Sequence, residues 1–543
     1  MTNRTRIDSL LLAGFCAFLF FYGLAQFGLI GADEPRYAEV SREMLQRHDW
    51  VTPMLGGRPW LEKPPLYYWQ AMVAYAIFGV SDWAARLPSA LDATLLVLVV
   101  YFFLRRFRPG VELDGALMVA SCAGIVGYAR AASMDMALAA AFTGGLLGWW
   151  AWRESGKTIY LATFYAFMAL GTLAKGPVAL FLAGMVLIVY AATVHELRLI
   201  LKTLWLPGIL LFCAIALPWY FAVQMRNPEF FREFIVEQNL GRFSQNLYHH
   251  TEPVWYYLPV AALALVPWTV FVIAVFVQRV RLWWAERGPA NATEGDSENR
   301  FGVFACCWLI VPVLFFSISQ SKLPGYILPA IPAGALLLSD YLRRRLEQSD
   351  AEPAATGLVV LHALLAGGLI IPALLIAYLV TQHRLPGGQP MLVALAVAFV
   401  LCAGIALTLV RKGGLRMLRF VTLIPVVLTV GAVLRLGAVS LDQTLSARPL
   451  ALEIAGIETH PMPLAVYHVR RELEYGLTFY RNQLTFNYDW GSVPQEEHLL
   501  VAPENSQVEI AKLVAGRRVS YLGHYAAQDV DYYWVAAGVA SPH

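Results

Sequence analysis

The sequence predicts a polytopic α-helical membrane protein with a small α/β domain at its C-terminal end. Hydrophobic residues make up 58% of the 543 residues and charged residues only 15%, with a mean hydropathy of +0.54. Soluble proteins carry roughly 25% charged residues, so this composition excludes a soluble globular class. The net charge of +3, spread between apolar segments, also argues against a nucleic-acid partner.

Apolar segments near the roughly 20 residues that cross a bilayer predict about thirteen transmembrane helices. They lie at about 9–30, 88–104, 113–129, 136–152, 158–174, 177–194, 203–222, 254–278, 302–318, 325–341, 356–380, 390–410 and 417–438. The shorter stretch 66–80 is rich in Tyr and Trp, which favours an interfacial or re-entrant helix. The first segment lacks a small-residue cleavage site, so we expect an uncleaved span.

The basic loops all fall on one side of the membrane when 66–80 is not counted as a span. They are 105–108, 153–157, 195–202, 278–287, 343–345 and 411–419. Because basic loops mark the cytoplasmic side, the opposite side is predicted to be periplasmic. That side receives the first loop 31–87, the turns around Asp135 and Lys175, and the loops 223–253 and 319–325.

The composition changes after Ser440. Short β-prone segments at 464–469, 484–488, 499–502 and 519–522 alternate with helix-like pieces. We therefore predict two domains: a transmembrane domain over residues 1–440 and a periplasmic α/β domain over residues 441–543. All six cysteines lie in apolar segments, which favours buried apolar side chains over a disulfide framework or a zinc site.

Two adjacent acids and an arginine follow the first apolar segment at once, in the run Asp33-Glu34-Pro35-Arg36-Tyr37. Pro35 suits the first turn of a helix. Apolar and aromatic residues then recur at helical spacing, which predicts an amphipathic juxtamembrane helix. One acid would suffice to cap this helix. Capping leaves the second acid and Arg36 unexplained, so we favour a functional site.

Charged residues in the other outer loops have a functional and a structural interpretation. Arg58, Glu62 and Lys63 precede the stiff turn Pro64-Pro65, where an interfacial ion pair is the alternative to a site. Asp135 stands at the end of a span, where an acid is costly unless it faces a cavity or a partner. The structural alternative there is an ion pair with Arg130.

Two lysines lie at tight turns on the same predicted side. Lys175, in Ala174-Lys175-Gly176-Pro177, either serves a phosphate or extends to lipid headgroups. Lys322 and Tyr326 belong to a Pro-Gly turn. Acids beside several cations suit transfer of a group away from a phosphate, since the cations stabilise charge on the leaving group and an acid orients the acceptor. Membrane burial indicates that the phosphate belongs to a lipid.

Several of these motifs resemble those of the C-type membrane glycosyltransferases of the protein O-mannosyltransferase superfamily. They are Asp33-Glu34-Pro35-Arg36-Tyr37, Glu62-Lys63-Pro64-Pro65-Leu66-Tyr67-Tyr68, Ala85-Arg86-Leu87-Pro88, Ala174-Lys175-Gly176-Pro177 and Ser321-Lys322-Leu323-Pro324-Gly325-Tyr326. The last turn and His250-x-x-Pro253-x-Trp255-Tyr256-Tyr257 are more similar to the bacterial 4-amino-4-deoxy-L-arabinose lipid A transferases. The resemblance covers the whole membrane part.

The resemblance implies an inverting glycosyltransferase in the bacterial inner membrane. It would move aminoarabinose from undecaprenyl phosphate to lipid A phosphates at the periplasmic face and confer polymyxin resistance. It implies thirteen spans, a periplasmic C-terminal domain and, in our expectation, a monomer. The related superfamily members that use other sugars share the first-loop motif, so the sugar identity depends on the shorter turn motifs.

The resemblance also assigns roles to residues. Asp33 would be the main catalytic-site acid, with Glu34 beside it and Asp135 as the second-loop acid. The donor phosphate and substrate would be bound by the cationic and tyrosine side chains of the outer loops. These are Arg36, Tyr37, Arg58, Lys63, Lys175, Lys322 and Tyr326.

A divalent metal such as zinc is a further expectation, with Glu62 and His250 as ligands. Adjacent histidines alone supply no ligand geometry, and solvated loop histidines are the competing interpretation of His249 and His250. A catalytic need for the metal is doubtful, because the acceptor phosphate is already anionic.

Two alternatives remain open on the sequence. A related polyprenyl-phosphate-sugar transferase would glycosylate a protein or another envelope glycan, and a hydroxyl acceptor would then require a general base. A lipid-sugar flippase or transporter would place its ionisable residues near the bilayer midplane, often in paired repeats. Here they lie at span ends on one side.

Overall fold

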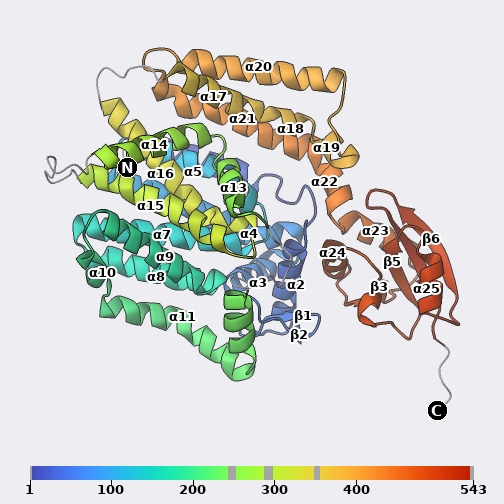
Figure 1. The fold of residues 1–543 in the computed structure, drawn as a ribbon. Helices are drawn as coiled ribbons and strands as arrows, with labels where there is room; N and C mark the ends of the chain where they lie inside the picture. Colours follow the sequence, from blue (N-terminus) through green and yellow to red (C-terminus); the bar gives the residue numbers. More distant parts are fainter. Residues whose placement is uncertain (1–2, 242–251, 286–296, 348–354, 539–543) are drawn as a thin grey trace.

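The computed structural model describes residues 3–241, 252–285, 297–347 and 355–538. Most helices lie alongside one another in a bundle, and a five-stranded sheet lies beside one end of it (Figure 1). Helices α17 (Thr356–Gly368), α20 (Gln389–Leu409) and α21 (Leu418–Ala432) form an outer layer of the bundle. The predicted class, a polytopic helical membrane protein with a small C-terminal strand domain, is confirmed.

Eight helical stretches of the described residues are long and apolar enough to cross a membrane. They include α4 (Asp82–Phe107), α8 (Thr158–Lys175), α11 (Leu206–Arg226), residues 300–318 of α15 (Ser297–Ile318), η4 (Pro324–Ala330) with α16 (Ile331–Glu347), α17 with α18 (Ile370–Leu374), α20, and the run Gly414–Leu445, which holds α21, η6 (Val433–Gly437) and α22 (Ala438–Leu445). Counting two bent pairs as spans raises this number to ten. The expected count of thirteen is not confirmed.

The remaining predicted spans are shorter or bent. Helix α1 (Asn3–Cys16) continues through η1 (Ala17–Phe21) and ends there, because Tyr22 is extended and Gly23 has a φ of +65°. Helices α5 (Glu112–Ser121) and α6 (Ala123–Ala129) meet at 65°. The stretch Val254–Ala264, with α13 (Tyr257–Ala264), meets α14 (Thr269–Ala285) at 118°.

The core of the bundle is aromatic and lies where three helices meet. Helix α7 (Met134–Ser155) contributes Trp149 and Trp150, and α9 (Val178–Thr193) contributes Tyr190, all fully buried. Phe304 of α15 stacks on Trp149 with ring centroids 5.6 Å apart. Such large aromatic side chains bury much apolar area at one point, which locks α7, α9 and α15 together.

The first loop folds on the bundle as two helices and a small hairpin. Helix α2 (Asp33–Gln46) is amphipathic as expected and buries Tyr37, Val40 and Met44. Strands β1 (Met54–Leu55) and β2 (Arg58–Pro59) form the hairpin. Helix α3 (Leu66–Phe78) has 13 residues and spans only about 20 Å, too short to cross a bilayer.

The C-terminal strands form one mixed sheet in the order β4-β3-β5-β7-β6. Strands β3 (Leu464–Val466), β4 (Thr485–Asn487) and β5 (His498–Pro503) are parallel, while β6 (Val519–Tyr525) and β7 (Val530–Val535) are antiparallel to their neighbours. Helices α23 (Arg448–Ile457), α24 (Arg471–Arg481) and α25 (Gln507–Leu513) accompany the sheet. The helix α24 packs against α2 of the first loop.

Candidate active site

The two adjacent acids open helix α2. Ala32 occupies the N-cap position, and Asp33 and Glu34 are the first two helical residues. Carboxylates in the first turn are stabilised by the positive end of the helix dipole. Neither acid holds the N-cap position, so capping does not account for them. Their two side chains lie in different surroundings.

Glu34 lies in a buried ion pair with Arg86 of α4. The closest atoms, Arg86 Nη2 and Glu34 Oε2, are 2.6 Å apart, and both side chains are almost fully buried. The same guanidinium donates to the carbonyls of Leu24, Phe27 and Gly28. Glu34 also accepts hydrogen bonds from the backbone N–H groups of Ile30 and Ala132, each at 2.8 Å.

Both Glu34 oxygens therefore accept hydrogen bonds. They join α2 to the segment before it, to α4 and to the segment before α7. A buried charge is stable only when paired and hydrogen-bonded, and this carboxylate is both. The geometry favours a positioning role for Glu34 over the predicted catalytic one: it holds the first loop against α4 and the segment before α7.

Asp33 pairs instead with Arg36, one turn further along α2. The Arg36 side chain is 13% exposed and that of Asp33 is 53% exposed. The guanidinium carbon lies 5.1 Å from the ring centroid of Tyr37, 5.2 Å from that of Trp60 and 5.7 Å from that of Tyr475. Three aromatic rings thus surround one cation at cation–π distance.

Three polar hydrogens around Arg36 have no acceptor among the described residues. They belong to Arg36 Nε, Trp60 Nε1 and the Tyr68 hydroxyl, all buried. An unsatisfied buried donor costs about 1–3 kcal/mol, which an acceptor supplied by a ligand would offset. Burial raises the pKa of Tyr68 well above its usual range, and its hydroxyl therefore keeps the proton it donates. These donors suit an anionic oxygen such as that of a phosphate.

A second acid–cation pair lies at the start of α7. Lys175, the last residue of α8, forms an ion pair with Asp135. The Ser133 hydroxyl donates to the second Asp135 oxygen at 2.8 Å. The expected alternative, an Asp135–Arg130 pair, is wrong, because Arg130 donates instead to the carbonyls of Leu19 and Gly23 at 3.0 and 2.9 Å.

The turn that carries Tyr326 closes over this second pair. The Lys175 ammonium lies 4.7 Å from the Tyr326 ring centroid. A Cβ added at Gly325 would lie 2.8 Å from the Asp135 carboxyl carbon and 2.7 Å from the Tyr128 hydroxyl. Only glycine lets the backbone come so near the acid, which explains the Pro-Gly sequence of the turn.

The two acid–cation pairs face a common region. Burial raises the pKa of Tyr37, and the negative charges of Asp33 and Asp135 both add to this shift, so both acids act on one hydroxyl. The charge of Lys63 also acts on Asp135. The structure thus brings together the predicted residues Asp33, Arg36, Tyr37, Lys63, Asp135, Lys175 and Tyr326 from four parts of the chain.

Two other predicted binding residues lie differently. Lys322 is buried and donates to the carbonyls of Ser319 at 2.6 Å and Glu252 at 3.0 Å, so it fastens its own turn to the segment before α13. Arg58 is exposed on the β1–β2 hairpin. Within the described ranges, no hydrogen bond or ion pair joins Arg58 to the two acid–cation pairs. Its role stays a prediction.

The expected metal ligands are Glu62 and His250. His250 lies outside the described residues. The charge of Glu62 acts on Arg36 and Tyr68, which places the carboxylate beside a cation. The part of the chain that is described contains no group of three or more His, Cys, Asp or Glu side chains arranged to hold a metal. Among the described residues, Glu62 therefore has no second and third ligand for a metal.

The C-terminal helix α24 contributes a residue that sequence reasoning missed. Tyr475 covers Arg36, and the Arg42 guanidinium of α2 donates to the carbonyls of Phe479 at 2.7 Å and Thr478 at 3.2 Å. The Tyr480 hydroxyl donates to Asp82 and accepts from the Leu29 N–H, both at 2.6 Å. No local signal links Tyr475 to Arg36, because more than 400 residues separate them in the sequence.

Three comparisons with known proteins bear on the family and the fold of this chain. A family described as dolichyl-phosphate-mannose-protein mannosyltransferase matches residues 9–232. An undecaprenyl phosphate-alpha-4-amino-4-deoxy-L-arabinose arabinosyl transferase from Pseudomonas aeruginosa is 32% identical over 416 residues, or 74% of this chain and 72% of that one. Its counterpart from Pseudomonas paraeruginosa is 32% identical over 355 residues, or 64% of this chain and 62% of that one. These alignments span about two thirds of the relatives' own length.

Among solved structures, ArnT from Cupriavidus metallidurans bound to undecaprenyl phosphate has the same fold. The TM-score is 0.75 at 24% sequence identity, with 98% of this chain and 99% of that chain covered. The apo structure of the same protein gives a TM-score of 0.72 at 23% identity. Because these two structural alignments cover nearly the whole chain, the similarity of fold includes the C-terminal sheet.

Proposed function

Since the chain belongs to the undecaprenyl phosphate-alpha-4-amino-4-deoxy-L-arabinose arabinosyl transferases, we propose that it transfers this amino sugar from undecaprenyl phosphate to phosphate groups of lipid A. It is a membrane glycosyltransferase. The observation that carries the proposal is the group of buried donors without acceptors around Arg36, beside two acid–cation pairs. A lipid-linked phosphate matches both the donors and the apolar surroundings.

The donor phosphate would bind at Arg36. The guanidinium Nε, the Trp60 indole N–H and the Tyr68 hydroxyl point to three hydrogen bonds with its oxygens. Arg36 is held in place by its aromatic neighbours and by Asp33, so little ordering is needed when the phosphate binds. Lys63 and Lys175 add positive charge in the same region.

The reaction is a single displacement at the anomeric carbon. An oxygen of the lipid A phosphate attacks this carbon and forms a new C–O bond. The bond from the carbon to the undecaprenyl phosphate oxygen breaks, and its electron pair stays on that oxygen. Attack opposite the leaving group inverts the configuration. Cations already in position stabilise the charge that develops on the leaving phosphate.

The acids have a different task, because an anionic acceptor needs no general base. The sugar carries an amino group that is cationic near neutral pH, and a carboxylate is its natural partner. One oxygen of Asp33 accepts from Arg36, and within the described residues the other oxygen has no partner. Asp33 would therefore bind the sugar while it orients Arg36. Asp135 would hold the Lys175 ammonium toward the phosphates.

We propose further that the site faces the periplasm from the inner membrane and that the protein acts as a monomer. In α7 and α8, the basic residues Arg153 and Lys157 lie at the ends opposite to Asp135 and Lys175, in accord with a cytoplasmic location of the basic loops. One chain supplies every side chain named here. Aminoarabinose on lipid A lowers its negative charge, so the activity would confer polymyxin resistance.

The test is mass spectrometry of lipid A from polymyxin-sensitive bacteria that lack their own transferase, with and without this protein. We expect lipid A to gain the mass of one aminoarabinose. Asp33→Ala should abolish the gain while the protein remains folded in the membrane. Glu504→Ala, at an exposed acid of the C-terminal sheet domain, is the matched control and should leave the gain unchanged.

Other outcomes would point elsewhere. No mass gain with folded protein and donor lipid present would contradict the acceptor assignment and favour a protein or another glycan as acceptor. A mass gain that survives in Asp33→Ala would contradict the site. Movement of the lipid-linked sugar across the membrane without transfer would instead indicate a flippase.

A further inference from the structure

A second cluster of cations lies at the opposite end of the bundle from the active site. Helix α9 begins three residues after Lys175 and ends at Thr193, about 24 Å away for its 16 residues. Between its end and the short helix α10 (Arg198–Thr203) the chain forms a corner with a surface pocket of about 710 Å³. His195, Glu196, Arg198 and Lys202 line the pocket.

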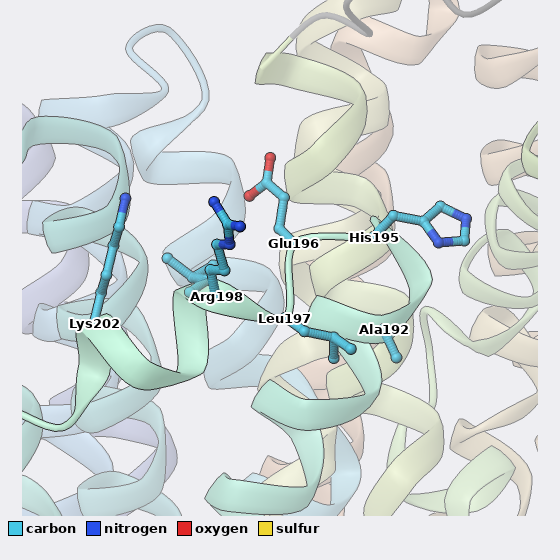
Figure 2. Close-up of a pocket in the computed structure, with 7 residues that line it drawn as sticks. Ala192, His195, Glu196, Leu197, Arg198 and Lys202 are labelled. Carbon is cyan, nitrogen blue, oxygen red and sulfur yellow. The ribbon is translucent and has the colours of Figure 1, made fainter.

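The cations of this pocket point to one side. Arg198 and Lys202 are four residues apart, so they share one face of α10. Figure 2 shows both side chains directed to the same side as Glu196, while Leu197 and Ala192 are directed to the other. Within the part of the chain that is described, neither Arg198 nor Lys202 forms a hydrogen bond or an ion pair.

Glu196, the acid among the described residues that line the pocket, does not neutralise these cations. Glu196 is already paired with two other arginines, with Arg153 of α7 at 3.0 Å and with Arg300 of α15. The charges of Arg198 and Lys202 are therefore left over, and the corner carries an excess of positive charge. An anion entering the pocket would meet these two cations without having to displace an existing partner.

The corner is also fixed in place. Trp149 of α7 donates its indole N–H to the Thr203 hydroxyl at 2.9 Å, and Tyr165 of α8 donates to the Thr203 carbonyl at 2.7 Å. Together with the Glu196 ion pairs, these bonds tie the corner to α7, α8 and α15. Fixed surroundings lower the ordering cost of binding a ligand.

Apolar side chains border the cations on the outer surface. Leu197, Leu201 and Leu204 are 60%, 69% and 63% exposed. A short helix with leucines on one side and cations on the other matches a segment that lies at the membrane surface, with its apolar face toward acyl chains. The pocket then lies at the depth of the lipid headgroups.

We propose that this corner binds the headgroup of an anionic glycerophospholipid, with its phosphate between Arg198 and Lys202 and its acyl chains along the exposed leucines. Basic pockets at the ends of membrane helices are a known type of site for such headgroups. The inference is independent of the proposed sugar transfer, because it uses none of the residues of the active site.

The test is native mass spectrometry of the full-length protein in detergent, titrated with cardiolipin, phosphatidylglycerol or phosphatidylethanolamine. We expect the two anionic lipids to remain bound and the zwitterionic lipid not to. The double variant Arg198→Gln/Lys202→Gln should bind the anionic lipids roughly 10- to 30-fold more weakly. Each Lys or Arg beside an anionic headgroup raises the affinity by roughly fivefold, and the variant removes two of them.

The matched control is Arg105→Gln/Arg106→Gln, which removes two exposed cations at the end of α4. It should leave lipid binding unchanged. Both variants should keep the thermal transition of the parent protein, because none of the four side chains is buried. Equal binding by the Arg198/Lys202 variant and the parent would overturn the proposal. So would equal binding of phosphatidylethanolamine, or displacement of the lipid by inorganic phosphate alone.

Discussion

Two ion pairs that start from neighbouring residues have opposite surroundings. The Glu34–Arg86 pair is almost fully buried, and every atom of both charged groups that can be bonded is bonded to another segment. The Asp33–Arg36 pair is local to one helix turn, half open on the acid side and surrounded by aromatic rings and unsatisfied donors. The first pair holds the loop against α4, and we propose that the second contacts the substrate.

The difference between these two pairs shows that adjacent acids of one motif can have different roles. Consecutive helical residues point about 100° apart. Glu34 therefore turns into the protein, toward α4, when Asp33 turns outward. The two acids of the motif need not share a chemical role for both to be required.

The largest expected effect is on the buried pair. Glu34→Ala leaves the Arg86 charge unpaired in the protein interior, and such a loss costs about 3–5 kcal/mol. We expect little folded protein and a marked fall in the thermal unfolding temperature of what is recovered. Asp33→Ala, at a half-exposed side chain, should shift that temperature far less. Equal destabilisation by the two variants would contradict the division of roles.

The Asp135–Lys175 pair is expected to govern the rate of transfer. Lys175→Met removes a cation from the phosphate region and should lower kcat by roughly 10²- to 10³-fold, as for loss of one stabilising donor. The measurement is sugar transfer by purified protein with donor lipid and lipid A. Lys175→Arg should restore part of the rate.

Helix α8 offers a matched control for this prediction. Lys157, directly before the other end of α8, is exposed, and Lys157→Met should leave kcat unchanged. A normal rate in Lys175→Met would show that the Asp135–Lys175 pair is structural, like the Glu34–Arg86 pair.

A smaller effect is expected from the C-terminal domain. Tyr475→Ala removes one of three rings on Arg36, and a cation–π contact of about 0.5–2 kcal/mol corresponds to a loss of roughly 2- to 30-fold in kcat/KM. Tyr475→Phe keeps the ring and should keep the activity. Trp490→Ala, at an exposed aromatic residue of the same domain, should have no effect. Full activity of Tyr475→Ala would show that the C-terminal domain does not contribute to the site through this residue.

The smallest expected effect is the pH dependence caused by His498, a buried histidine of the C-terminal sheet. Burial lowers the pKa of His498 in β5 from its usual value of 6.5, with the cation of Arg517 adding to the shift. Below pH 6.5 the unfolded chain then binds more protons than the folded one, so the stability of the sheet falls as the pH decreases.

Hydrogen exchange of β5 in the full-length protein, measured between about pH 5 and 8, would detect this change. His498→Gln should remove the pH dependence at this strand. A sheet whose protection rises toward acid would contradict the sign of the effect.

Local sequence patterns were enough to predict most of the architecture. The low charge content and the long apolar segments predict a membrane bundle, the spacing of Tyr37, Val40 and Met44 predicts α2, and the change after Ser440 predicts the strand domain. Each of these depends on residues near one another in the chain, whose periodicity and burial are linked directly.

The number and course of the spans were less predictable. Hydropathy measures apolar length but not the direction of the helix axis, so the bend at Cys122 had no counterpart in the hydropathy pattern. The break between α13 and α14 contains Pro267, which marks a helix end but not the angle between the two helices. The early end of the first helix at Phe21 likewise depends on backbone dihedrals at Tyr22 and Gly23.

The assembly of the site was decided by contacts between distant segments. The motif identified Asp33 and Glu34 as a pair, but only packing against α4 turned Glu34 into a structural anchor. Asp135 was matched with Lys175 and not with its sequence neighbour Arg130, because the end of α8 meets the start of α7. Tyr475 joined Arg36 across the domain boundary. Residue types and local periodicity follow from the chain itself, whereas the partner of a charge depends on which surfaces meet when the helices pack.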